Sequence, residues 1–157
     1  MGIEIERKFL LRDQSWRQQA DAGVDYRQGY LHGDASIAVR VRAAGDAAWL
    51  TIKGGGGGVS RLEFEYPIPV ADADVMLAEL CRPPLIEKRR YRVPFEGHVW
   101  EIDVFAGANA GLVLAEIELE HPDQPFARPP WLGEEVSDDP RYFNAQLSRH
   151  PYSEWGK

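Results

Sequence analysis

The sequence contains almost no cysteine and no long apolar run. Cys81 is the single cysteine among 157 residues, so an intramolecular disulfide cannot form. This fits a cytoplasmic location, where thiols stay reduced. No uninterrupted apolar stretch approaches the roughly 18 to 20 residues that a membrane-spanning helix requires. The first residues lead into a charged segment without an apolar signal region. We therefore expect a cytoplasmic protein with no membrane partner.

Basic residues and histidines are also scarce. The 25 Asp and Glu residues outnumber the 18 Lys and Arg residues, and the formal net charge is −7. Nucleic acids attract basic surfaces, so we expect no nucleic-acid partner. The histidines are scattered at positions 32, 98, 121 and 150, and the chain has neither an HExxH motif nor a pair of cysteines. A zinc site made of these residue types is therefore not indicated.

The chain does contain enough apolar sequence for one core. We expect a single domain over residues 1–157, because a second core would be crowded at this length. Apolar and polar residues alternate with a period of two in many segments, which predicts β-strands. The expected strands are 3–11, 26–32, 36–43, 47–53, 60–70, 85–94, 98–105 and 112–120. Short turns with Gly, Asp or Asn join several of them and favour antiparallel neighbours.

Three segments have helical features. Residues 13–21 predict a short helix, and residues 71–81 predict a second one because their apolar residues recur at helical spacing. After a proline-rich stretch at 126–133, residues 138–148 predict a capped helix near the end of the chain. No internal repeat is evident, and no linker long enough to divide domains.

Five glycines at 54–58 follow Lys53. A Walker phosphate loop needs Lys and then Ser or Thr directly after its last glycine, at the start of a helix. Here Val59, Ser60 and Arg61 follow, and a strand begins. The glycines therefore predict the flexible tip of a hairpin and not a phosphate loop.

The predicted strands each have one apolar face and one charged face, because alternate side chains point to opposite sides of a sheet. Lys8 and Lys53 lie on such charged faces. Like charges occur two residues apart: Glu4 with Glu6, Glu63 with Glu65, Glu101 with Asp103, Glu116 with Glu118, Arg40 with Arg42, and Lys88 with Arg90.

A solvent-exposed sheet face with many ion pairs is one interpretation, since antiparallel sheets commonly have one wet face. Such faces usually mix polar residues with charges of both signs, whereas like charges two apart on a strand repel each other. The second interpretation is that groups of opposite charge compensate these like-charged pairs. Divalent cations suit the carboxylates, and an extended polyanion suits the bases.

A sheet of about eight strands closes naturally into a barrel, because closure removes exposed edges. We predict a mainly β fold: a closed eight-stranded antiparallel β-barrel forming a polar tunnel, with a few short helices packed outside and a C-terminal helix. Burying unpaired charge costs several kcal/mol per ion. We therefore expect water, metal and polyphosphate inside. Oxygen ligands without a His or Cys cluster favour Mg²⁺ or Mn²⁺.

The motifs on these strands resemble those of the CYTH superfamily of triphosphate tunnel metalloenzymes. The ExExK pattern of Glu4, Glu6 and Lys8 is weak by itself, but further motifs accompany it. They are QGY at 28–30, RVR at 40–42, LTIK at 50–53, RLEFEY at 61–66, EKRRY at 87–91, EIDVF at 101–105, AEIELE at 115–120 and GEEVSDDPRYFN at 133–144. The resemblance covers nearly the whole chain. It implies an eight-stranded antiparallel barrel that binds a triphosphate beside divalent metal ions.

The resemblance also implies roles for individual residues. The principal metal ligands would be Glu4, Glu6, Glu116 and Glu118, while Glu63, Glu65, Glu101 and Asp103 would complete the acidic side or pair with bases. The triphosphate would be bound by Lys8, Arg40, Arg42, Lys53, Arg61, Lys88 and Arg90. The catalytic candidates are Glu4, Glu6, Lys8 and Tyr30, with Tyr30 as a hydrogen-bonding group at the phosphates or as a packing aromatic. Arg141 either reaches the tunnel mouth or forms a surface ion pair.

Within the superfamily, the chain is most similar to compact bacterial inorganic triphosphatases, on the motifs MGIEIERKFLL, QGY and RYFN. The expected reaction is hydrolysis of tripolyphosphate to pyrophosphate and phosphate, with another organic triphosphate as the alternative substrate. The alternatives are a class IV adenylate cyclase, a thiamine or nucleoside triphosphatase, and a polyphosphate- or nucleotide-binding module without hydrolysis.

Two observations separate these alternatives. The four leading glutamates favour an enzyme, since a binding module has no need of metal carboxylates. No base-stacking aromatic is evident among the expected tunnel residues, which weighs against a cyclase, although Trp16, Trp49 or Trp131 could lie at a mouth. The sequence leaves open whether the chain forms a homodimer.

Overall fold

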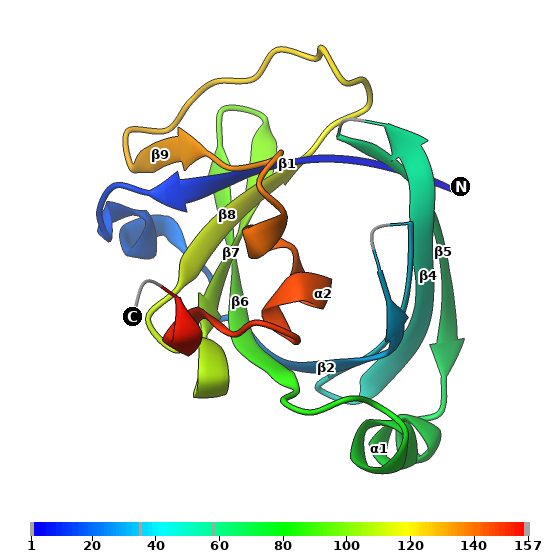
Figure 1. The fold of residues 1–157 in the computed structure, drawn as a ribbon. Helices are drawn as coiled ribbons and strands as arrows, with labels where there is room; N and C mark the ends of the chain where they lie inside the picture. The colour runs from blue at the N-terminus through cyan, green and yellow to red at the C-terminus, as the bar shows by residue number, and fades with distance from the viewer. Residues whose placement is uncertain (1, 35, 58, 156–157) are drawn as a thin grey trace.

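The structure is a computed structural model that describes residues 2–34, 36–57 and 59–155. Within these residues, nine strands form one antiparallel sheet in the order β5-β4-β3-β2-β6-β7-β8-β1-β9 (Figure 1). Their bounds are β1 (Ile3–Leu11), β2 (Val24–Gly33), β3 (Ile37–Ala44), β4 (Ala47–Gly57), β5 (Ser60–Ile68), β6 (Ile86–Phe95), β7 (His98–Phe105), β8 (Val113–Glu118) and β9 (Leu132–Glu135).

Strand β1 closes the sheet into a barrel. Its first residues pair with β5, with Ile3 opposite Leu62, and its middle pairs with β8, with Glu6 opposite Glu118. The ring therefore has eight strands, and the predicted mainly β barrel is confirmed. Strand β9 is an addition that the periodicity did not predict. It pairs with the end of β1, with Leu11 opposite Leu132, and four residues are too few to establish an alternating pattern.

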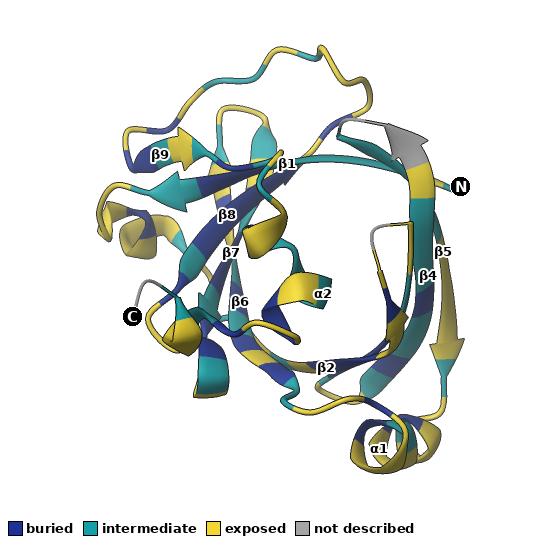
Figure 2. Ribbon diagram, viewed as in Figure 1, coloured by how far each residue is buried: buried dark blue, intermediate teal, exposed yellow. Residues whose placement is uncertain are grey.

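Most of the apolar residues pack outside the barrel. One cluster lies over β1, β7 and β8 and includes Phe9, Trp100 and Ile117, all at most 1% exposed. The 3-10 helix Ser15–Gln19 and the loop before β9 add Trp16 and Trp131 to this cluster. Figure 2 shows the resulting buried band along the strands. On these strands the apolar faces pack outward and the charged faces turn inward; the outer face of β5 stays exposed, with Phe64 at 44% and Tyr66 at 53%.

Helix α1 (Val70–Glu79) covers the outer faces of β3 and β4. Its Ala73 and Leu77 pack with Val41 and Ala48. The chain after α1 passes so close to β2 that a Cβ atom on Gly29 would lie 2.7 Å from the Cβ of Cys81. Glycine at this position therefore permits the close packing.

The other predicted helices are shorter than expected. Residues 13–21 contain only the 3-10 helix Ser15–Gln19. The predicted helix 138–148 is divided into a 3-10 helix, Pro140–Tyr142, and α2 (Asn144–Leu147), because Phe143 between them has an extended backbone with ψ of 135°. No helix of the described residues is both long enough and apolar enough to cross a membrane.

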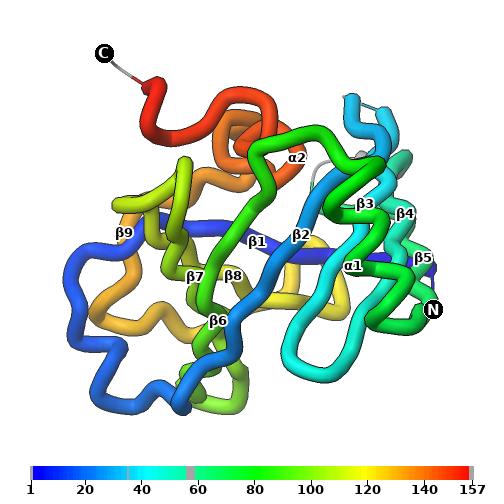
Figure 3. The backbone as a smooth tube through the Cα atoms, turned by 90° about the horizontal axis from the view of Figure 1, so that it is seen from below, coloured from blue at the N-terminus to red at the C-terminus, as the bar shows by residue number. Residues whose placement is uncertain are grey.

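The glycine run extends β4. Gly54 pairs with Leu62 and Gly57 with Ser60, so these glycines approach the hairpin that joins β4 to β5. Gly58 lies outside the described residues. At this same end of the barrel, α2 lies over the lumen, whereas the β3–β4 turn lies at the opposite end (Figure 3). The barrel therefore has one end covered by the C-terminal segment Ser137–Leu147 and one end without it.

Candidate active site

The inner faces of the strands line a cavity of about 640 Å³. All the site residues predicted from the sequence line it, with the exception of Asp103. Most of their charges are divided between two continuous parts of the ring; Lys8 on β1 and Arg61 on β5 are cations on strands that otherwise contribute carboxylates. The basic wall, on β4, β3 and β6, comprises Lys53, Arg40, Arg42, Lys88 and Arg90; the acidic wall, on β7, β8, β1 and β5, comprises Glu101, Asp103, Glu116, Glu118, Glu4, Glu6, Glu63 and Glu65.

Arg90 joins the two walls. Its guanidinium group donates to both oxygens of Asp103, at 2.8 and 2.9 Å, and also to Glu101 and Glu116, each at 3.2 Å. Lys88 Nζ lies 2.7 Å from Asp103 Oδ2. Burial opposes ionisation of Asp103, but Arg90 and Lys88 hold its pKa well below the ordinary value. Asp103 therefore pairs with bases, which is one of the two roles that the resemblance implied for it.

Glu116 and Lys88, which belong to these ion pairs, both have shifted pKa values. Burial alone would raise the pKa of Glu116, but Lys8 and Arg90 lower it to about 2. Burial lowers the pKa of Lys88 to about 7, and the neighbouring cations Arg90 and Arg42 act in the same direction. A polyanion beside Lys88 would oppose both effects and favour its charged form.

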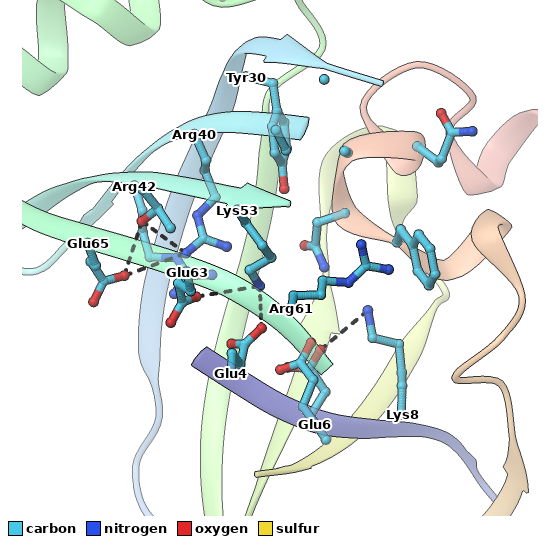
Figure 4. A pocket seen from close by; sticks show the side chains of 18 of the residues that line it. Glu4, Glu6, Lys8, Tyr30, Arg40, Arg42, Lys53, Arg61, Glu63 and Glu65 are labelled. Carbon is cyan, nitrogen blue, oxygen red and sulfur yellow. Dashed lines mark hydrogen bonds and ion pairs between the residues drawn. The ribbon is translucent and has the colours of Figure 1, made fainter. Parts of the chain in front are cut away.

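Lys53 lies beside the acidic wall, because Glu63 is its register partner on the neighbouring strand β5. Figure 4 shows its ammonium group between Glu4, with Nζ 2.7 Å from Oε1, and Glu63, at 3.6 Å. Burial would lower the pKa of Lys53, but Glu6 and Glu4 outweigh it and raise that pKa. Lys53 is therefore a permanent cation in the middle of the site.

Arg40 and Arg42 are positioned by two residues that the sequence analysis did not assign to the site. Arg40 donates to Thr51 at 3.2 Å, and Thr51 donates to Glu65 at 3.1 Å. Arg42 donates through Nε to Gln28 at 2.8 Å. Thr51 and Gln28 are at most 1% exposed. The sequence contained a signal for each. Thr51 shares a strand face with Lys53, and Gln28 belongs to the QGY motif.

Arg40 also has an unused donor. Its Nε is buried and has no hydrogen-bond partner among the described residues. The whole residue is only 8% exposed, so water has little access to this donor. Burial, with Arg40 and Arg90 nearby, lowers the pKa of Arg42 to about 10, so Arg42 remains charged near neutral pH. A buried donor without an acceptor, beside several other cations, fits an anion in this part of the cavity.

The acidic wall contains carboxylates that oppose each other. Glu6 on β1 lies directly across from Glu118 on β8. Burial, followed by the charges of Glu116 and Glu4, raises the pKa of Glu6 to about 7. Burial and the carboxylates of Glu4, Glu101 and Glu6 also raise the pKa of Glu118. Because oxygen-rich, mutually repelling carboxylates are relieved by a hard cation, this donor set fits Mg²⁺ or Mn²⁺.

The carboxylates are not gathered around one point as metal ligands would be. Within the described residues, no three Asp, Glu, His or Cys side chains converge in that way. The ion pair of Glu4 with Lys53 and that of Glu116 with Lys8, at 3.3 Å, account for this arrangement. A bound metal would therefore have to draw these side chains away from their present partners.

The C-terminal segment closes one end of the cavity. Lys8 Nζ donates to the Tyr142 carbonyl at 3.0 Å, and the guanidinium of Arg61 lies 4.9 Å from the centre of the Phe143 ring. Asn144 Oδ1 accepts hydrogen bonds from both Gln28 and Lys88, each at 3.1 Å. Asn144 is a further residue that the sequence analysis did not assign. It connects the segment to the basic wall.

Arg141, in contrast, does not enter the cavity. It is exposed and binds Asp139 at 2.7 Å, as the interpretation of a surface ion pair predicted. Tyr30 has both of its expected features: it packs with Ile86 and Leu147 in a core cluster, and it lines the cavity. Its hydroxyl group points into the cavity in Figure 4.

Two aromatic residues line the cavity toward the end that the C-terminal segment does not cover. They are Tyr26 on β2 and Trp49 on β4. This corrects the expectation that the tunnel set has no base-stacking aromatic. Trp16 and Trp131 are buried in the outer core and lie at neither mouth.

Comparison with known proteins gives a match to a domain family, two relatives with named functions and a similar solved structure. The CYTH domain pattern matches residues 2–150. An inorganic triphosphatase of Acetivibrio thermocellus is 50% identical over 152 residues, which cover 97% of this chain and 97% of that protein. An inorganic triphosphatase of Nitrosomonas europaea is 41% identical over 150 residues, which cover 92% and 96%. The crystal structure of an inorganic triphosphatase superimposes with a TM-score of 0.64 at 36% identity, covering 92% of this chain and 96% of that one.

Proposed function

Because the chain belongs to the CYTH domain family, we propose that it is a metal-dependent inorganic triphosphatase. It cleaves a phosphoanhydride bond of tripolyphosphate and releases pyrophosphate and phosphate. The names of the two relatives at 50% and 41% identity support this function. The cytoplasm is the proposed location, because the single cysteine, Cys81, cannot form an intramolecular disulfide that would need an oxidising compartment.

One observation carries the proposal: a basic wall faces an acidic wall across a cavity inside the barrel. A triphosphate presents several negative charges along a short chain, and a row of bases can bind it at many points. We assign this role to Lys8, Arg40, Arg42, Lys53, Arg61, Lys88 and Arg90. The unpartnered Nε of Arg40 supports the assignment, because a phosphate oxygen would supply the missing acceptor.

We assign the metal to the opposing carboxylates Glu4, Glu6, Glu116 and Glu118, with Mg²⁺ or Mn²⁺ as the ion. The raised pKa of Glu6 and that of Glu118 support this choice, since both result in part from neighbouring carboxylates. When bound, the ion would neutralise phosphate charge and acidify a coordinated water. Glu63, Glu65, Glu101 and Asp103 are assigned to holding the bases in place, because each lies within 4 Å of a basic-wall cation.

The residues of the chain provide positioning and charge neutralisation, which is most of what phosphoryl transfer requires. A water oxygen attacks the terminal phosphorus, and the phosphoanhydride bond breaks with its electron pair on the pyrophosphate oxygen. The bases stabilise the charge that develops on this leaving group. The proton of the water passes to a carboxylate of the acidic wall or to solvent. Tyr30 donates a hydrogen bond to a phosphate oxygen.

A phosphate-release panel tests the function. The purified protein is assayed with Mg²⁺ and with Mn²⁺ on tripolyphosphate, ATP, thiamine triphosphate and pyrophosphate. We expect tripolyphosphate to be the best substrate, pyrophosphate to resist, and the chelator EDTA to stop the reaction. Faster formation of cyclic AMP from ATP than hydrolysis of tripolyphosphate would make the protein a cyclase. Tight triphosphate binding without any release of phosphate would make it a binding module.

A further inference from the structure

We propose that Asn144, on the C-terminal segment, is a positioning residue of the triphosphate site. It holds Lys88 directly and Arg42 through Gln28, so that both bases present their remaining donors to the phosphates. This inference rests on the proposed function, because it concerns bases that are assigned there to the triphosphate. It goes beyond that function by making a segment outside the sheet part of the binding machinery.

A series of three hydrogen bonds carries the inference. Asn144 Oδ1 accepts one hydrogen bond from Lys88 Nζ and another from Gln28 Nε2, each at 3.1 Å. At the other end of the Gln28 amide, Oε1 accepts a hydrogen bond from Arg42 Nε at 2.8 Å. Gln28 is wholly buried and Lys88 is 2% exposed, so water cannot easily replace these partners. One amide oxygen of the segment is thus connected to two bases of the basic wall.

The directions of these hydrogen bonds follow from the chemistry of the side chains. A protonated lysine and an arginine can only donate, so Asn144 must turn its oxygen toward Lys88, and Gln28 must turn its oxygen toward Arg42. The nitrogen of Gln28 is then left to donate to the same oxygen of Asn144. Reversing either amide would bring two donors together. The three hydrogen bonds therefore support one another and form a single arrangement.

Arg42 depends on this arrangement more than the other bases do. The other four members of the basic wall each form an ion pair with a carboxylate. Arg42 forms no such pair with the described residues, and its side-chain hydrogen bond among them is the one to Gln28. The two terminal nitrogens of its guanidinium group therefore remain available to phosphate oxygens. The orientation of Arg42 is thus set by neutral amides.

The ammonium group of Lys88 is shared between a charged and a neutral acceptor. Of its three donors, one is directed to Asp103 Oδ2 at 2.7 Å and one to Asn144 Oδ1 at 3.1 Å. The third has no acceptor among the described residues and can bind a phosphate oxygen. Asn144 is neutral, unlike Asp103. It therefore orients the ammonium group without cancelling the positive charge that attracts a polyanion.

The C-terminal segment is itself firmly packed, as a positioning element must be. Tyr142 and Leu147, on either side of Asn144, lie in the core cluster that contains Ile86 of β6. Leu147 and Ile86 are both fully buried. The segment also holds a third base, because the Tyr142 carbonyl accepts a hydrogen bond from Lys8 Nζ at 3.0 Å. Since these apolar contacts anchor the segment, a change at Asn144 should act on the bases and leave the segment in place.

Equilibrium binding tests the positioning role without depending on turnover. Isothermal titration calorimetry with Mg²⁺ measures the Kd of the hydrolysis-resistant bis-methylene analogue of tripolyphosphate. The variants are Asn144→Ala, which removes the acceptor, Gln28→Met, which removes the link to Arg42, and the double variant. The matched control is Gln19→Ala, an amide-to-alanine change at an exposed position on the 3-10 helix Ser15–Gln19. Steady-state hydrolysis of tripolyphosphate gives KM and kcat, and thermal unfolding verifies that each variant is folded.

We expect Asn144→Ala to raise the Kd of the analogue and the KM for tripolyphosphate about tenfold, because hydrogen bonds that orient charged groups are lost. The proposed metal ligands are untouched, so kcat should change by less than about threefold. A merely structural role would instead lower kcat through loss of folded protein and leave KM unchanged. Gln28→Met should have an effect of similar size. The double variant should fall well short of the roughly hundredfold loss that two independent changes would give.

The control Gln19→Ala should match the wild type in every measurement. An unchanged Kd and KM in Asn144→Ala would overturn the positioning role. A full, roughly hundredfold loss in the double variant would overturn the connection through Gln28. If Gln28→Met does not fold, Asn144→Ala decides the proposal alone. Absence of tripolyphosphate hydrolysis by the wild type would refute the proposed function, whereas the Kd values would still decide the role of Asn144.

Discussion

The basic wall and the acidic wall differ in how completely their charges are paired within the protein. Arg90 contacts Asp103, Glu101 and Glu116, and Lys53 lies between Glu4 and Glu63. In the acidic wall, Glu6 lies opposite Glu118, and neither forms an ion pair with another described residue. Four of the five bases are thus held in position by carboxylates and Arg42 by Gln28, whereas Glu6 and Glu118 of the acidic wall lack compensation among the described residues.

The two walls therefore need their ligands to different degrees. Paired cations keep a fixed geometry and retain free donors such as Arg40 Nε, so the basic wall is organised before a phosphate arrives. Opposed carboxylates are destabilising until a cation neutralises them. The acidic wall therefore depends on its ligand for stability, and the basic wall much less. Substitutions in each wall, and one outside both, test this contrast.

The largest effect is expected on turnover. Glu4→Gln or Glu6→Gln removes a charge from the proposed metal site and should lower kcat for tripolyphosphate by roughly 100-fold or more, since a catalytic metal contributes several kcal/mol. Phosphate release at saturating substrate and Mg²⁺ measures this. Glu79→Gln, at an exposed position on α1, is the matched control. Full metal-dependent activity of the Glu4→Gln, Glu6→Gln double variant would refute the site assignment.

Next in size is the effect of removing the residue that joins the walls. Arg90→Met leaves the buried carboxylates of Asp103 and Glu116 without their partner and should lower the free energy of unfolding by about 3–5 kcal/mol. Urea denaturation provides the measurement. Arg92→Met, on the same strand with a side chain 61% exposed, is the control and should lose much less. Equal losses in the two variants would show that the basic wall is not organised by ion pairs.

In the absence of metal, Glu6→Gln is expected to raise the free energy of unfolding, by less than Arg90→Met lowers it. The folded state raises the pKa of Glu6 from 4.5 to about 7, so the stability of the wild type falls as the pH rises through this range. The variant has no carboxylate to ionise here, so its free energy of unfolding should exceed that of the wild type by on the order of 1 kcal/mol at pH 8 and by less at pH 5. The value is modest because Glu6 is only partly buried. Urea denaturation in EDTA at both pH values tests it, and added Mg²⁺ should favour the wild type. A variant less stable than the wild type at pH 8 would contradict the proposed repulsion.

The smallest effect is expected outside both walls. Arg141→Ala breaks an exposed ion pair with Asp139 and should change the free energy of unfolding by no more than about 1 kcal/mol. Because Arg141 does not enter the cavity, kcat/KM for tripolyphosphate should stay near the wild-type value. Denaturation and a steady-state assay provide the two measurements. A large loss of kcat/KM would place Arg141 in the site after all.

Strand periodicity predicted the barrel well because alternation is a local property. Residues 47–53 and 98–105 alternate over a whole strand, and both are strands in the structure. The helix expected at 138–148 failed because the extended backbone of Phe143 interrupts it. Strand β9 exists because β1 offers its edge, which is a contact between distant segments. Neither feature has a clear periodic signal.

Which residues face the lumen follows from the sequence alone, because alternate side chains of a strand point to opposite faces and the apolar face packs outward. It therefore predicted a shared charged face for Glu4 with Glu6 and for Arg40 with Arg42, and all four residues line the cavity. Which strands adjoin depends on the tertiary structure, which places most of the bases on one side of the ring and the carboxylates, together with Lys8 and Arg61, on the other. Barrel closure also paired Glu6 with Glu118, and chain reversal placed Asn144 over the lumen. Such contacts join residues at least 56 positions apart, so no local pattern records them.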